Sequence, residues 1–175
     1  EYVEGEIMPR RRDLDGGWHR DEDLARSTFE KVHQGLVNID VQRAMWPKDF
    51  GGLELSPDVF DLIIEEISRA DAGLANHIGI IGWTMYPALR AGRMDLLQSF
   101  IPKICDDKPH GSCMSITEPS GGANVEDPTL HGRTINTIAK LDGDEWVING
   151  HKIWPSGASV SDITYCTICT TDPQK

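Results

Sequence analysis

The sequence predicts an α+β protein in which an all-α region, residues 1–109, is followed by a region of antiparallel β-structure, residues 110–175. Before Pro109 the apolar residues recur with the spacing of amphipathic helices, whereas after it they alternate as in strands. Asp142-Gly143 and Asn149-Gly150 are typical hairpin turns. Because the helices precede the strands instead of alternating with them, the order excludes a βαβ dinucleotide-binding unit.

The predicted helical segments are residues 1–12, 21–35, 56–71, 73–89 and 94–104. The first is expected to stop near Pro9. In the second, Asp21 can cap the start, Gly35 can end the helix, and Leu24 is among the apolar positions. Ser56 is the expected N-cap of the third, since a proline follows it. The fourth is apolar nearly all round, Trp83 included, which predicts a buried helix.

The predicted strands are residues 112–117, 133–141, 145–148, 153–154 and 161–171. They are short, rich in β-branched residues and separated by glycine turns, as in an antiparallel sheet. Such a sheet would leave an open edge, so we expect further protein to cover it. Since Glu1 already lies in helix-like sequence, we also expect both ends of the chain to be cut.

Charge argues against a nucleic-acid or anionic-membrane partner. The formal net charge is −11, and both regions are acidic, whereas such partners need a basic face. The run Arg10-Arg11-Arg12 is followed closely by acidic residues, and we expect it to be a solvated helix end. The sequence contains no apolar stretch long enough for a transmembrane helix and no recognisable targeting segment.

The four cysteines, Cys105, Cys113, Cys166 and Cys169, indicate a reducing compartment, because the chain is not short and shows no secretory signal. Cys166 and Cys169 have CxxC spacing. They lie in a predicted strand, where residues three apart point to opposite faces, so we expect a structural role and no metal. His77 is likewise expected to be a core or boundary histidine.

Two segments, residues 113–124 and 142–158, concentrate small residues, hydroxyls and an aromatic. A flavin needs hydrogen-bond donors at its polar edge and a flat apolar surface over its ring. Thr117 and Ser156 offer hydroxyls, Gly122 lets a ligand approach the backbone closely, and Trp154 offers the flat surface. Ordinary loops and a core tryptophan are the alternative interpretation.

Four motifs, in the same order, resemble those of acyl-CoA dehydrogenases. They are WPKDFGG at residues 46–52, EEISRADAGLA at 65–75, SITEPSGGAN at 115–124 and DGDEWVINGHKIWPSGAS at 142–159. The resemblance implies that the chain contains the N-terminal helical domain and the first, incomplete part of a barrel-like middle β-domain. It also implies that the middle domain holds FAD.

Carried onto this chain, the resemblance implies specific contacts. The FAD-binding residues would be Met114, Ile116, Thr117, Gly122, Ala123, Trp154 and Ser156. Ser115 and Ala123 would border the acyl-thioester. Ala123-Asn124 replaces the usual Ser-Asp, which removes one hydroxyl contact worth about 0.5–1.5 kcal/mol. Pro155 replaces a commoner isoleucine and removes an N–H. The family's catalytic base belongs to its C-terminal domain, so no residue here is assigned that role, and Glu118 is expected to be structural.

The implied reaction is the α,β-desaturation of an acyl-CoA, with hydride transfer to flavin N5. An electron-transferring flavoprotein would take the electrons. A C-terminal domain or further chain would complete the fold, and the expected assembly is a homo- or hetero-oligomer, a tetramer. Bacterial cytoplasm or the mitochondrial matrix is the expected location. The alternatives are a non-catalytic half-site subunit of a heteromer and a flavin oxidase or monooxygenase.

Overall fold

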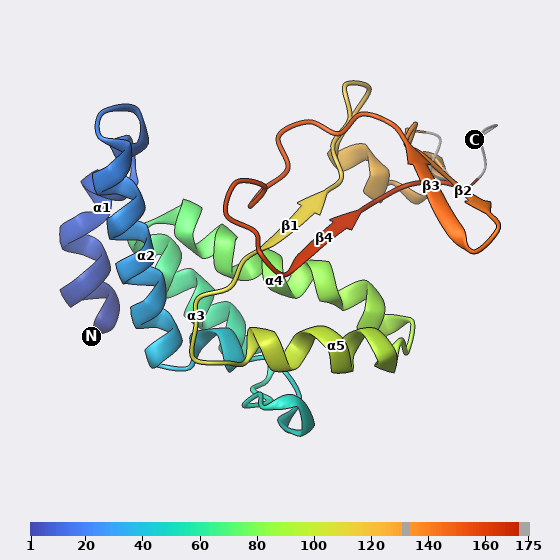
Figure 1. Ribbon diagram of the computed structural model, residues 1–175. Coiled ribbons are helices and arrows are strands. Elements are labelled where there is room, and N and C mark those ends of the chain that lie inside the picture. Colours follow the sequence, from blue (N-terminus) through green and yellow to red (C-terminus); the bar gives the residue numbers. More distant parts are fainter. Residues whose placement is uncertain (131–133, 172–175) are drawn as a thin grey trace.

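The computed structural model describes residues 1–130 and 134–171, and in it the helices precede the strands, as predicted (Figure 1). The α-helices are α1 (Arg11–Leu14), α2 (Glu22–Asn38), α3 (Pro57–Ala70), α4 (Ala72–Arg90) and α5 (Met94–Ile104). The strands are β1 (Ser112–Ser115), β2 (Ile138–Asp142), β3 (Glu145–Asn149) and β4 (Thr164–Thr167). Short 3₁₀ turns connect several of these elements.

The first helical segment does not stop at Pro9, so that prediction is wrong. A π-helical turn, Val3–Ile7, and a 3₁₀ turn, Met8–Arg10, lead into α1 without a break. Pro9 sits in the first turn of the 3₁₀ helix, where a proline costs no hydrogen bond because its missing N–H would have had no partner there. The segment therefore remains helical as far as Leu14.

Helix α2 begins as predicted but ends later. The Asp21 side chain accepts a hydrogen bond from the Leu24 N–H at 3.0 Å, which confirms the N-cap. The prediction that Gly35 ends the helix is wrong, because α2 continues to Asn38. The ring of Tyr2 occupies the space that a Cβ at Gly35 would fill, so this glycine serves helix packing. The Leu24 side chain is 47% exposed and does not belong to the core.

Helix α4 is the central element, packing against α3 on one side and against β1 and β4 on another (Figure 1). The Asp71 carboxylate caps it at 2.7 Å from the Leu74 N–H. The prediction that α4 is buried all round is wrong within the described residues, because Trp83 is 60% exposed. No described helix is both long and apolar enough to cross a bilayer.

The strands form two pairs, and in the ranges described they do not close into a barrel. β2 and β3 form the predicted antiparallel hairpin, with Ile138 opposite Asn149. β1 and β4 instead run parallel, with Ser112 opposite Thr164. The two strands begin side by side, because the Gly111 carbonyl just before β1 accepts hydrogen bonds from the N–H groups of Asp162 and Ile163 just before β4. Strands that leave the same point in the same direction run parallel. Residues 153–154 form no strand, and residue 133, the first of the predicted strand 133–141, lies outside the described residues.

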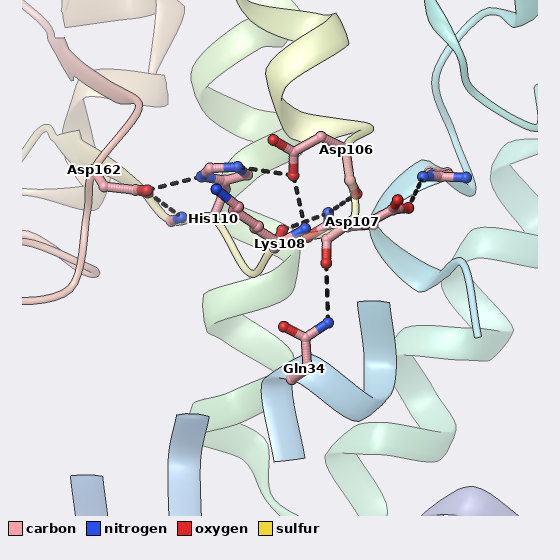
Figure 2. Close-up of polar contacts among 9 residues, drawn as sticks. Gln34, Asp106, Asp107, Lys108, His110 and Asp162 are labelled. Carbon is pink, nitrogen blue, oxygen red and sulfur yellow. Dashed lines mark hydrogen bonds and ion pairs between the residues drawn. The ribbon is translucent and has the colours of Figure 1, made fainter. Parts of the chain in front are cut away.

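A polar cluster holds the junction between helices and strands (Figure 2). His110 lies between two carboxylates, with Nδ1 2.7 Å from Asp162 Oδ2 and Nε2 3.0 Å from Asp106 Oδ1. Burial opposes the charged imidazole, but the hydrogen bonds to the two carboxylates outweigh it and raise the pKa of His110. The buried Gln42 side chain donates to the carbonyls of Asp106 and Lys108. The start of β1 is thereby fixed against both α5 and the loop before β4.

Candidate functional site

The two segments singled out in the sequence meet in the structure. Met114 in β1 forms an isolated antiparallel bridge with Ser156. Next to it, the Ile153 N–H donates to the Thr117 carbonyl at 2.9 Å. The Lys152 ammonium donates to the Ile116 carbonyl at 2.8 Å. These backbone contacts place Met114, Thr117 and Ser156 on one wall, which we call the candidate wall.

Trp154 projects from the candidate wall into open space. Its side chain is 80% exposed, and its φ of 36° is rare for a residue with a bulky side chain. The bonds of Ile153 and the bridge at Ser156 hold the backbone on either side of it. Strained residues of this kind concentrate at ligand sites, because the surrounding structure keeps a side chain in a position it would otherwise leave. An indole face is therefore presented for stacking.

The glycine-containing loop packs against Thr117. The Glu118 and Gly121 backbones exchange two hydrogen bonds, of 2.8 and 3.0 Å, which close a tight turn. A Cβ at Gly122 would lie 3.1 Å from the Thr117 hydroxyl, so this backbone already approaches the side chain closely. Ala123 is exposed at the start of a 3₁₀ turn, and among the described residues none of the hydrogen bonds that join the candidate wall involves it. The Asn124 amide oxygen is buried without a partner among the described residues.

Glu118 is the one acidic residue of the TEP step, and it is held in a structural network. Its side chain is 3% exposed and accepts from Lys152 Nζ at 2.8 Å, from the Asn136 N–H at 2.7 Å and from the Thr137 N–H at 2.9 Å. Burial alone would raise the pKa of Glu118, but these hydrogen bonds lower it to about 2. A carboxylate this weakly basic and fully occupied is unsuited to abstract a proton.

The remaining predicted residues lie in or beside β1. Ser115 and Ile116 are half-buried, and the Ser115 carbonyl accepts from the Ile168 N–H at 3.0 Å, which joins this segment to the end of β4. The thiols of Cys166 and Cys169 are free and half-buried. Within the described ranges, no group of three metal-ligating side chains is assembled.

A cavity of about 1000 Å³ adjoins the candidate wall, and sequence reasoning did not find it. Ser156 and Gly157 line it on the β side. Its other walls come from α1, the turn after α1 and the first residues of α4, including Arg11 and Arg12. The only hint in the sequence is the basic run in α1, whose surroundings depend on how the loop before β4 folds back over the helices.

Comparison with protein families gives two adjoining matches. The acyl-CoA dehydrogenase N-terminal domain matches residues 1–108, and the acyl-CoA dehydrogenase middle domain matches residues 113–175. Acyl-CoA dehydrogenase FadE29 of Mycobacterium tuberculosis is 32% identical over 158 residues, covering 85% of this chain and 38% of that protein. Cyclohexane-1-carbonyl-CoA dehydrogenase of Syntrophus aciditrophicus is 28% identical over 146 residues, covering 83% of this chain and 36% of that protein.

Solved structures agree in fold. The butyryl-CoA dehydrogenase from Megasphaera elsdenii superposes with a TM-score of 0.74 at 21% identity, covering 99% of this chain and 42% of that one. A nitroalkane oxidase superposes with a TM-score of 0.77 at 21% identity, over 99% of this chain and 41% of that one. At these identities the likeness shows the fold alone. The chain spans two fifths or less of the length of the curated relatives described here.

Proposed function

Because the chain belongs to the acyl-CoA dehydrogenase family, we propose that residues 1–175 form the helical and first β portions of a FAD-dependent acyl-CoA dehydrogenase. The complete protein would remove hydrogens from the α and β carbons of an acyl-CoA thioester. This proposal concerns the whole protein, to which the chain contributes one side of the flavin and acyl-thioester site.

The observation that supports the proposal is the contact between residues 113–122 and residues 152–156. The second of these segments contains the exposed Trp154. The residues present fit a flavin. The Trp154 indole is 80% exposed and can cover one face of a planar ring system. Thr117 and Ser156 supply hydroxyls on the same wall, and the backbone at Gly122 is free of a side chain that would hold a ligand away.

In the proposed complex, Thr117 and Ser156 would donate hydrogen bonds to the polar edge of the flavin, and Trp154 would pack against its face. Met114 and Ile116 would lie beside the ring, while Ser115 and Ala123 would border the thioester. When bound, FAD supplies the acceptor for the hydride that leaves the substrate. Trp154 would also exclude water from the ring, which preserves the strength of the nearby hydrogen bonds.

The base that removes the α-proton is proposed to come from outside residues 1–175. Glu118 is engaged by Lys152 and by two backbone N–H groups, so it would have to leave a buried ion pair to act. Ala123-Asn124, which stands where the family usually has Ser-Asp, supports a second candidate, in which the chain belongs to a non-catalytic half-site subunit of a heteromeric dehydrogenase. Transfer of electrons to an electron-transferring flavoprotein, and an oligomeric assembly, are part of the first proposal.

Trp154→Ala tests the flavin contact, with Trp146→Ala as the matched control. Both indoles are largely exposed, but Trp146 lies in β3, outside the candidate wall. Loss of an aromatic contact of about 0.5–1.5 kcal/mol should weaken FAD binding roughly two- to tenfold in Trp154→Ala. Quenching of flavin fluorescence on titration with protein measures this. Trp154→Phe should retain most of the affinity.

Failure of the wild-type chain to quench flavin fluorescence would contradict the proposal, as would equal weakening by the two alanine variants. Addition of an acyl-CoA without oxygen to the flavin-loaded complete protein, which would include the proposed base, then separates the two candidates. Bleaching of the flavin supports the dehydrogenase, and an unchanged spectrum supports the half-site subunit.

A further inference from the structure

We propose that the cavity beside Ser156 receives the distal carboxylate of an acyl thioester, with Arg11 and Arg12 as its cationic contacts. The inference rests on the proposed function for the thioester end of the ligand. It adds a substrate class, acyl groups that end in a carboxylate, and two specificity-determining residues on the helical side of the site.

The arginines that line this cavity form no ion pair with a carboxylate, whereas most other arginines in the described chain do. Ion pairs with carboxylates engage Arg10, Arg26, Arg43, Arg69 and Arg93. No carboxylate within 4 Å pairs with Arg11, Arg12, Arg20 or Arg90 in the part of the chain that the structure describes. Three of these four line the one cavity. In a chain with a net charge of −11, unpaired cations gathered at a cavity indicate an anionic ligand.

The local charges leave Arg11 and Arg12 available. The Arg20 guanidinium donates to the Gly16 and Arg12 carbonyls, so it holds the turn after α1 in place. Two carboxylates also line the cavity. The Asp71 carboxylate is engaged as the cap of α4. Asp15 is the other acidic residue in the lining. Three guanidinium groups against two carboxylates leave the cavity positive.

A buried imidazole adds a polar contact independent of the arginines. His77 lines the cavity, is only 7% exposed, and its Nε2 has no hydrogen-bond partner among the described residues. A buried polar atom without a partner costs stability, which a polar ligand group or a water molecule can relieve. Burial lowers the pKa of His77 to about 4, so near neutral pH the ring offers a hydrogen bond without a charge.

Part of the cavity lining is apolar. Leu14, Phe29 and Val160 are among its lining residues, and such apolar side chains suit the methylene chain of an acyl group. The volume of about 1000 Å³ is at the upper end of the range of about 300–1,000 Å³ usual for ligand pockets. The exposed guanidinium groups of Arg11 and Arg12, which line the same cavity, would then meet a carboxylate at the far end of the acyl chain.

Binding of adipoyl-CoA and of hexanoyl-CoA to the same protein tests the inference. These ligands have equal chain length and differ at the distal carbon, so calorimetric titration isolates the carboxylate. We expect adipoyl-CoA to bind about tenfold more tightly, as suits a charge-assisted contact. Arg11→Gln/Arg12→Gln should abolish that ratio. Arg90→Gln, which removes an unpaired arginine outside the cavity, should preserve it.

Free CoA distinguishes a carboxylate from a phosphate as the anion. If the double variant weakens free CoA as much as adipoyl-CoA, the arginines bind phosphate and the inference is overturned. A wild-type ratio near one, or a ratio that survives the double variant, also overturns it. The flavin titration is separate, so loss of FAD binding with the adipoyl preference intact would remove the proposed function and leave the carboxylate site.

Discussion

Lys152→Met should destabilise the β region by breaking the buried ion pair with Glu118. The two side chains are 9% and 3% exposed, and the Nζ–Oε1 distance is 2.8 Å. Removal of one partner leaves an uncompensated buried carboxylate, which costs about 3–5 kcal/mol. Glu118 keeps the N–H groups of Asn136 and Thr137 as donors, so we expect the lower end, about 3 kcal/mol.

The pKa of Glu118 gives a second measure of the same network. It falls from its usual 4.5 to about 2 in the folded protein. At about 1.4 kcal/mol per pH unit, the lowered pKa corresponds to a stabilisation of up to about 3 kcal/mol. Because the folded-state pKa is the lower one, this stabilisation is present above pH 4.5 and is lost as the pH falls toward 2.

Urea unfolding of the wild-type chain and its variants measures the effect. Arg93→Gln, which breaks an exposed pair with Asp95, is the control and should barely change the unfolding midpoint. Glu118→Gln/Lys152→Met removes both charges and should recover much of the loss seen in Lys152→Met. A Lys152→Met variant that unfolds within about 1 kcal/mol of wild type would refute the assignment of a buried, structural ion pair.

Two further predictions concern the junction of the helices and strands. His110 has a raised pKa between Asp106 and Asp162, so its stabilising contribution should be complete below about pH 6.5 and decline as the pH rises through the folded-state pKa. Thermal melts across this interval should show the decline in wild type and not in His110→Gln, and parallel curves would contradict it. Gly157→Ala should destabilise by more than Gly143→Ala, because both have positive φ but only at Gly157 does a new Cβ meet the Ser112 carbonyl. Equal unfolding midpoints would disprove that difference.

The candidate wall was largely predictable from residue chemistry and family resemblance. Thr117, Gly122, Trp154 and Ser156 drew attention because hydroxyls, a glycine and an aromatic are concentrated in two short segments. Neither segment reveals its partner contacts, however. The Ile153–Thr117 hydrogen bond and the Lys152–Glu118 pair each join residues more than thirty positions apart, and their formation depends on how the loops between them fold.

The arginine-lined cavity was not predictable, because the basic run of α1 looks like a solvated helix end. Arg11 and Arg12 do remain exposed, and they line a cavity only because the loop before β4 lies near α1 and the start of α4. The exposed Trp83 shows the same dependence, since an apolar helix face is buried only where another element packs against it.

The sequence by itself determined the order of helices and strands, because apolar period, capping residues and glycine turns are local properties of the chain. Asp21, Asp71 and the Asp142–Glu145 hairpin behave as local rules require. Only the tertiary structure decided that β4 lies parallel to β1 and that Trp154 projects from the candidate wall. Both depend on contacts between distant segments, which no local pattern encodes.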